Sequence, residues 1–233
     1  MNRTTEHTLI SHLKFAPASW LGLFLGLLIA SLAAVAAVDD RQYPTGTPAG
    51  LEPIKSQEFE ILYVKPGFEP SNYGKLLIEQ PEVSMQEFWE WKFTDNITRE
   101  EVEQISATTA RIVHEQFSTK LSAENGYELT ESKGDRVLIL KPSIIDLHLA
   151  APHRNQNQRT LIKSAGAATL YLEIRDGATS ELLLRAIDHD LARERVRFYT
   201  ASRTTNERDL EIMISRWAKG LRQHLNEMSS GTG

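Results

Sequence analysis

The sequence predicts an α+β protein in which two main helices cover a mostly antiparallel sheet, as a two-layer sandwich. Two long segments, near residues 98–123 and 206–225, repeat apolar residues at three- and four-residue steps, as helices with one buried face do. Short apolar or alternating segments lie before and between them, as expected for strands. The predicted order is two strands, a helix, three or four strands and a final helix, with both helices on the same face of the sheet.

The strands are expected at residues 58–64, 75–83, 137–149, 165–176 and 181–194. Pro81 ends the regular pairing of the second strand or moves that end to a sheet edge, and Pro142 marks a bulge or an edge position in the third. The short connection Gly177–Ser180 predicts a hairpin between the last two strands. The strand at 165–176 alternates apolar and polar residues, which indicates one wet face.

The two helices carry signals at their ends. Thr98 and Glu101 have the spacing of a capping box at the start of the first helix, and Asn125-Gly126 is a suitable left-handed terminator after it. The second helix is expected to begin near Asn206, a favourable N-cap residue. Its apolar stripe consists of Leu210, Ile214, Trp217, Leu221 and Leu225. Both stripes predict helices that are packed along one side.

The chain begins with the features of a secretory signal. Residues Trp20–Val38 contain no charged side chain, Arg3 and Lys14 precede them, and the apolar segment ends in small residues. The Ala-rich end favours cleavage, whereas an uncleaved segment 20–38 would be a membrane tether. Val35 stands where a lipoprotein signal has cysteine, so no lipid anchor is expected. The predicted organisation is a signal or anchor at 1–37, a flexible lead-in at 38–56, one α+β domain at 57–228 and a frayed tail at 229–233.

Composition excludes several classes of protein. With 41% hydrophobic and 24% charged residues, the chain is globular. Its formal charge of -5 argues against a nucleic-acid partner, since binding phosphates requires excess positive charge. It has no cysteine, and hence no disulfide, thiol nucleophile or zinc-thiolate site. No phosphate-binding glycine loop, G-x-S-x-G or H-E-x-x-H motif occurs, so we expect no cofactor and favour a non-enzymatic role.

The strongest polar pattern for a metal site lies on two predicted strands. Asp146 and His148 are two residues apart, as are Asp188 and Asp190, so strict alternation would place each pair on one face. If the two faces coincided, they could hold a divalent cation in a metal-dependent hydrolase. The favoured interpretation is instead a solvated sheet face, whose opposite face bears Ile145, Leu147, Leu149, Ile187 and His189. We therefore predict no metal site and keep these four residues as the alternative.

An aromatic segment lies between the second strand and the first helix. In an extended conformation Trp89, Trp91 and Phe93 would share a face next to Phe88, and such a row could dock an envelope protein, a glycan or a membrane surface. The favoured interpretation is that these rings close one end of the hydrophobic core. Phe88, Trp89, Trp91 and Phe93 are kept as the candidate partner-binding residues.

Four segments resemble a bacterial family known as domain of unknown function 3313 (DUF3313). They are YVKPGFEPSNYGKLLIEQPEV, ITREEVEQI, ATLYLEIRDGATSELLLRAIDHD and RWAKGLRQHL, in the family's order, between residues 59 and 227. The resemblance implies an exported protein, often a predicted lipoprotein, with no established activity or catalytic residues.

The sequence and this resemblance together predict an exported cell-envelope protein, located in the periplasm or at the periplasmic side of the membrane. We expect it to be a non-catalytic binding or accessory module for an envelope protein or a cell-wall component. The alternative function is an exported metal-dependent hydrolase that uses the Asp and His residues of the sheet.

Overall fold

The structure of the protein is a computed structural model that describes residues 46–86, 98–149, 161–162, 166–191, 199–200 and 202–231. The chain divides into the units Met1–Gln42 and Tyr43–Gly233, and all described residues belong to the second. Within these described residues, neither helix combines the length and apolar character that a membrane span requires. The signal or anchor predicted at 1–37 lies outside the described residues.

The second unit is an α+β sandwich, as predicted, with a mixed eight-stranded sheet in the order β1-β2-β9-β8-β6-β3-β5 and β4 beside β6. Its strands are β1 (Glu52–Pro53), β2 (Ile61–Val64), β3 (Lys75–Ile78), β4 (Glu82–Met85), β5 (Glu128–Leu129), β6 (Val137–Leu149), β8 (Gly166–Asp176) and β9 (Leu182–Leu191). Four neighbouring pairs in this sheet are antiparallel: β1 with β2, β2 with β9, β9 with β8, and β8 with β6. β3 and β4 each form a parallel pair with β6, and β5 forms a parallel pair with β3. A separate pair joins β7 (Leu161–Ile162) to β10 (Tyr199–Thr200).

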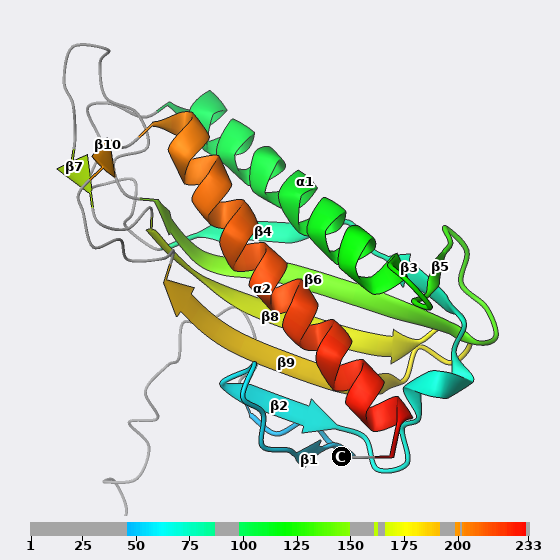
Figure 1. Ribbon diagram of the computed structural model, residues 1–233. Helices are drawn as coiled ribbons and strands as arrows, with labels where there is room; N and C mark the ends of the chain where they lie inside the picture. Colours follow the sequence, from blue (N-terminus) through cyan, green and yellow to red (C-terminus); the bar gives the residue numbers. More distant parts are fainter. Residues whose placement is uncertain are drawn as a thin grey trace, which may run out of the picture. The chain divides into compact units, whose positions relative to one another are not determined.

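Two long helices, α1 (Arg99–Ser122) and α2 (Arg203–Ser229), lie side by side on one face of the sheet and run in the same direction (Figure 1). The predicted capping box of α1 is confirmed, because Thr98 and Glu101 exchange backbone and side-chain hydrogen bonds. The predicted start of α2 near Asn206 is wrong, since Ser202 is the N-cap and Thr205 completes its capping box. Threonine in place of the usual Glu or Gln at the third position hid this signal.

The strand predicted at 75–83 is divided. β3 pairs with residues 137–140 of β6, and β4 pairs with residues 143–147, so the two short strands follow one another along the same side of β6. Pro81 lies in the interval between them, which agrees with the predicted end of regular pairing. Pro142 stands in register with Leu172, and the bulge of β6 lies further on, between Ile145 and His148. The lead-in expected at 38–56 includes β1, which is paired with β2.

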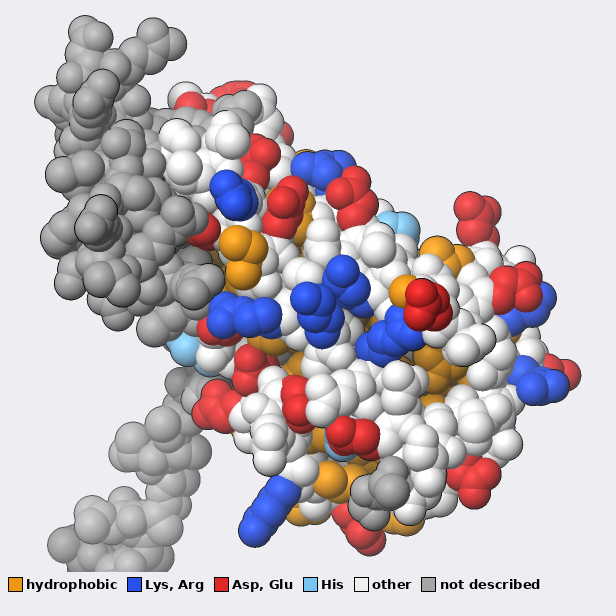
Figure 2. All heavy atoms as spheres, viewed as in Figure 1, with side chains coloured by type: hydrophobic (Ala, Val, Ile, Leu, Met, Phe, Trp, Pro, Cys, Tyr) orange, Lys and Arg blue, Asp and Glu red, His pale blue; other side chains and the backbone are white. Residues whose placement is uncertain are grey.

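The main hydrophobic core lies between the helices and the sheet. α1 contributes Ile112, Val113, Phe117 and Leu121, and α2 contributes Leu210, Met213, Ile214, Trp217, Ala218, Leu221 and Leu225. They pack on leucine and isoleucine side chains of the central strands, such as Leu140, Leu170 and Leu184. The opposite face of the helices carries interspersed acidic and basic side chains (Figure 2). The predicted amphipathic stripes therefore cover the same sheet face, as expected.

His224 of α2 gives this packing a pH dependence. Its side chain is buried, its Nε2 atom has no hydrogen-bond partner, and burial lowers its pKa although Glu227 and Glu58 oppose that effect. A group with a lower pKa in the folded state takes up its proton preferentially on unfolding. The free energy of unfolding should therefore fall as the pH drops through and below the ordinary histidine value of about 6.5.

We expect the variant His224→Gln, which cannot take up this proton, to lose less stability than the wild type between pH 7.5 and 5.5. The difference should be at most about 1.4 kcal/mol, because this range ends about one pH unit below the ordinary histidine pKa. Urea unfolding of both proteins at a series of pH values measures it. Parallel pH profiles for the two proteins would contradict the assignment to His224.

Candidate functional site

The two acidic residues predicted on β9 face the helices. Asp188 accepts a 2.7 Å hydrogen bond from the indole Nε1 of Trp217 in α2 and a 2.9 Å bond from the backbone N–H of Glu60. Asp190 forms a 2.6 Å ion pair with Arg216, also in α2. Both carboxylates thus join the sheet to the second helix, and the expectation that they line a solvated sheet face is wrong.

Asp146 and His148 lie elsewhere. Asp146 is the extra residue of the β6 bulge, with a left-handed φ of 53°, and its side chain is exposed. After this bulge Leu147 and Leu149 enter the core, so alternation places Ile145 and His148 on the helix-free face. The predicted common face of Ile145, Leu147 and Leu149 is therefore wrong. The structure does not bring the four candidates together, and no group of three or more metal-binding side chains occurs among the described residues.

The aromatic residues Phe88, Trp89, Trp91 and Phe93 lie outside the described residues. Their predicted role as partner-binding residues stays a prediction.

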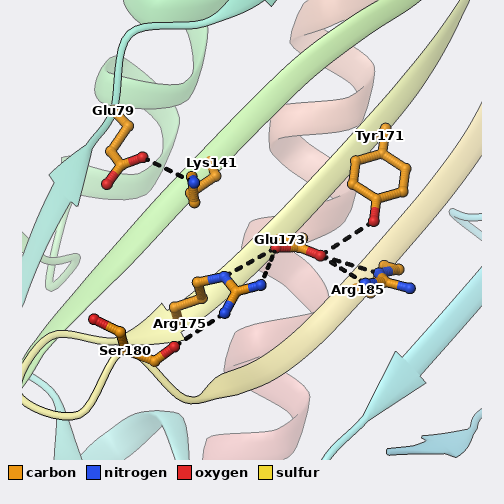
Figure 3. A network of polar contacts seen from close by, with 7 residues as sticks. All are labelled: Glu79, Lys141, Tyr171, Glu173, Arg175, Ser180 and Arg185. Carbon is orange, nitrogen blue, oxygen red and sulfur yellow. Dashed lines mark hydrogen bonds and ion pairs between the residues drawn. The ribbon is translucent and has the colours of Figure 1, made fainter. Parts of the chain in front are cut away.

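A polar network occupies the helix-free face of the sheet (Figure 3). Glu173 of β8 accepts hydrogen bonds from Arg185 of β9, with a shortest distance of 2.8 Å, and from Arg175, at 2.7 Å. The Tyr171 hydroxyl donates a further 3.1 Å bond to Glu173, and the Arg185 guanidinium lies 5.4 Å from the centre of the Tyr171 ring. Burial acts to raise the pKa of Glu173, but the bonds from the two arginines outweigh it and lower the pKa.

The polar side chains of this network satisfy one another's hydrogen-bonding groups. The Glu173 carboxylate is ionised and held on both oxygens, and burial, with the charge of Glu173, raises the pKa of Tyr171. Tyr171 also packs with Ile145 and Ile187 in a small apolar cluster. A carboxylate with these partners is a poor proton donor or acceptor for catalysis. We therefore assign the network to the stability of the sheet.

A small cavity of about 280 Å³ lies where the C-terminal ends of α1 and α2 meet the 3-10 helix η1 (Pro70–Asn72). We call it the junction cavity. Its lining residues come from η1 and Tyr73, from the end of α1 and the following turn, and from the last turns of α2; the polar ones are Ser71, Tyr73, Asn125, Tyr127, Arg222, Asn226 and Ser229. Three segments distant in the sequence thus converge on one polar cavity.

Local structure fixes two walls of the junction cavity. Asn125 adopts a left-handed φ of 60° after α1, as the predicted terminator requires, and the N–H of Tyr127 then bonds the carbonyl of Leu121 at 2.9 Å. Arg222 of α2 donates two 2.7 Å hydrogen bonds to the carbonyls of Lys120 and Glu124. This guanidinium meets the negative end of the α1 dipole and ties the two helix ends together.

Four polar side chains of the cavity have no hydrogen bond with any other described residue: Ser71, Asn125, Tyr127 and Asn226. Burial raises the pKa of Tyr127 to about 12, so its phenol is neutral at physiological pH. Burial, followed by the hydrogen bond to Asp176, likewise raises the pKa of Tyr73 to about 12. The junction cavity therefore presents uncharged donors and acceptors that are free to bind a ligand.

A larger groove of about 460 Å³ lies between β3 and α1, lined mainly by Leu76, Leu77, Ile78 and Leu129. Nothing in the described part of the chain indicates what would cover it, so we place the candidate site in the junction cavity. Sequence reasoning missed this cavity, because its residues form no motif. Its one sequence signal was the turn Asn125-Gly126.

The fold and the cavity define a two-layer α+β protein with a small, mainly polar cavity at the ends of its helices. Residues 45–221 match the family model described as protein of unknown function (DUF3313). The chain belongs to this family, as the resemblance of its motifs predicted. No curated protein matches the sequence.

Solved structures of other bacterial proteins are similar to this chain, and two of them are as follows. The PelC dodecamer from Paraburkholderia phytofirmans matches with 9% identity and a TM-score of 0.36, over 69% of this chain and 94% of PelC. A protein from Xanthomonas campestris matches with 11% identity and a TM-score of 0.39, over 72% of this chain and 94% of its own. We draw no functional conclusion from either similarity.

Proposed function

We propose that this chain is an exported envelope protein that acts by reversible binding, and that the junction cavity is its binding site. The observation that carries the binding role is the convergence, in one cavity, of four uncharged polar side chains that form no hydrogen bond with any other described residue. Export is supported by the uncharged segment Trp20–Val38 and the positive charges ahead of it. Periplasmic location is part of the proposal.

A metal-dependent hydrolase is the weaker alternative. It requires Asp146, His148, Asp188 and Asp190 to converge on one ion. Asp188 and Asp190 instead contact α2 on the helix-covered face, and His148 belongs to the helix-free face. The geometry therefore favours binding over metal-assisted hydrolysis by these residues.

The aromatic residues Phe88, Trp89, Trp91 and Phe93 remain our proposed contact for an envelope protein. Replacing Trp89 and Trp91 together by Ala should abolish a crosslink to that protein in cells. The thermal unfolding temperature should stay within a few degrees of the wild type if the rings serve binding. A large drop in that temperature would assign them to the core instead.

Cell fractionation and amino-terminal sequencing test the exported location. We expect the protein in the periplasmic or membrane fraction, protected from external protease until the outer membrane is opened. Sequencing distinguishes a form cleaved near Ala37 from one that keeps residues 20–38 as a tether. Recovery of the intact chain from the cytosol would contradict export.

Photocrosslinking in cells tests the binding role. A photoreactive amino acid at the exposed position Asn226, in the junction cavity, should give a defined product. The matched control is Glu211, which is exposed on the same helix outside the cavity. The absence of a product from Asn226, or the same products from both positions, would contradict a binding site in the cavity.

A further inference from the structure

We infer that the junction cavity takes an uncharged sugar residue, as a unit of an envelope glycan. This inference rests on the proposed function, because it names the ligand of the cavity proposed there as the binding site. It follows from the charge, the hydrogen-bonding groups and the size of the cavity.

Charge argues for a neutral ligand. The one ionised side chain among the described lining residues is Arg222, whose guanidinium is already bonded to the carbonyls of Lys120 and Glu124. The negative end of the α1 dipole offsets its charge. The phenols of Tyr73 and Tyr127 stay protonated, since the pKa of each is raised to about 12. A carboxylate or ammonium group entering the cavity would therefore lose hydration without meeting a free opposite charge.

The hydrogen-bonding groups fit hydroxyl-rich ligands. The amides of Asn125 and Asn226 each offer donors and an acceptor, and the hydroxyls of Ser71 and Tyr127 can donate or accept. A sugar hydroxyl has the same dual character, so it can pair with any of these four groups. An apolar or purely accepting ligand would leave part of this set unpaired.

Apolar surfaces complete the fit. Buried Leu121 and Leu225 line the cavity together with Pro70, beside the polar groups. A sugar ring has C–H faces that pack on such side chains while its edges carry the hydroxyls. The volume of about 280 Å³ lies just below the usual range for small-molecule sites, about 300–1,000 Å³, which favours one sugar unit over a long oligosaccharide.

Protein NMR titration of the purified full chain tests the ligand class. The neutral probes are glucose, N-acetylglucosamine and N,N′-diacetylchitobiose, and the charged isosteres are glucuronate and glucosamine. We expect at least one neutral sugar to shift the side-chain amide signals of Asn125 and Asn226, with both charged isosteres binding more weakly. Chitobiose binding more tightly than N-acetylglucosamine would favour a glycan chain as the source, whereas equal affinities would indicate a free or terminal sugar.

Two variants locate the binding. Tyr127→Phe and Asn226→Ala should each weaken sugar binding about threefold to tenfold, the effect of one lost hydrogen bond. The matched control Tyr63→Phe removes a tyrosine hydroxyl on β2, away from the lining residues, and should leave the affinity unchanged. Equal weakening by Tyr63→Phe would overturn the location.

The two proposals fail separately. If no neutral sugar shifts the cavity signals, or if glucuronate or glucosamine binds more tightly, the ligand class is wrong. A position-specific crosslink from Asn226 would in that case still support the binding role. If neither sugar binding nor that crosslink is found, the proposed function falls with the inference.

Discussion

Replacing Glu173 by Ala should lower the free energy of unfolding by about 3–5 kcal/mol, because it leaves a buried guanidinium without its counter-charge. The Arg185 side chain is only 9% exposed, and its ion pair with Glu173 joins β9 to β8. Arg175 loses the same carboxylate, but it keeps its 3.0 Å hydrogen bond to the Ser180 carbonyl. Its side chain is 32% exposed, so water can replace the carboxylate. Urea unfolding at neutral pH measures the loss.

A control for this variant lies on the same face of the sheet. Glu79 contacts Lys141 at 3.3 Å (Figure 3). It also contacts Lys133 at 3.3 Å, and both lysine side chains are about half exposed. Glu79→Ala should therefore cost less than about 1 kcal/mol. The double variant Glu173→Leu, Arg185→Met removes both buried charges and should recover much of the lost stability. Equal losses from Glu79→Ala and Glu173→Ala would contradict the role assigned to burial.

The ion pair between Glu173 and Arg185 also makes the stability of the protein depend on pH in acid. The pKa of Glu173 is lowered in the folded state, so its contribution to stability is fully present above the ordinary glutamate value and is lost as the pH falls through the folded value. The stability difference between wild type and Glu173→Gln should therefore shrink on acidification below about pH 4.5. A difference that stays constant down to the acid transition would show that Glu173 is not ionised at neutral pH.

Local signals allowed much of this fold to be predicted from the sequence. Thr98 and Glu101 are three residues apart, and Asn125 directly precedes Gly126, so each signal was visible without knowledge of the tertiary structure. Helix stripes follow from the same short-range periodicity. The fold class could be predicted because the apolar stripes of two helices must both be buried, and one face of a sheet can bury them together.

The remaining features depend on contacts between distant residues. β3 and β4 pair in parallel with β6 across the 24-residue helix α1, and no local pattern distinguishes this pairing from an antiparallel one. The bulge at Asp146 reverses the expected faces of Leu147 and His148 relative to Ile145 without changing the order of apolar and polar residues. Asp188 looked like a solvent-facing carboxylate because its partner Trp217 lies 29 residues away.

The candidate site illustrates the same limit. Ser71, Tyr127 and Asn226 are separated by more than fifty residues from one another, and none belongs to a recognisable motif. What brings them together is the parallel course of α1 and α2, which places both helix ends beside η1. Sequence reasoning finds a site when its chemistry is clustered in one segment, as a metal-binding motif is, and misses a cavity assembled by helix packing.

Gly126→Ala should cost about 3 kcal/mol, because a methyl group at this position has no space. A Cβ atom there would lie 2.1 Å from the carbonyl oxygen of Leu121 and 2.6 Å from that of Ala123. Both are backbone atoms at the end of α1, so no side-chain rotation relieves the clash. The hydrogen bond from the Tyr127 N–H to Leu121 must break or lengthen, and the turn that carries Asn125 and Tyr127 must move.

Thermal unfolding and amide hydrogen exchange distinguish this mechanism from a general loss of stability. A loss of about 3 kcal/mol should lower the Tm by roughly 6–12 °C in a domain of this size. The Tyr127 amide should exchange faster than the loss of global stability explains, because its bond to Leu121 is strained directly. Gly134→Ala is the matched control, since a Cβ atom there meets nothing within 4 Å. A Tm for Gly126→Ala equal to that of Gly134→Ala would show that the end of α1 can shift without cost, and the wall of the junction cavity would then not be fixed by this turn.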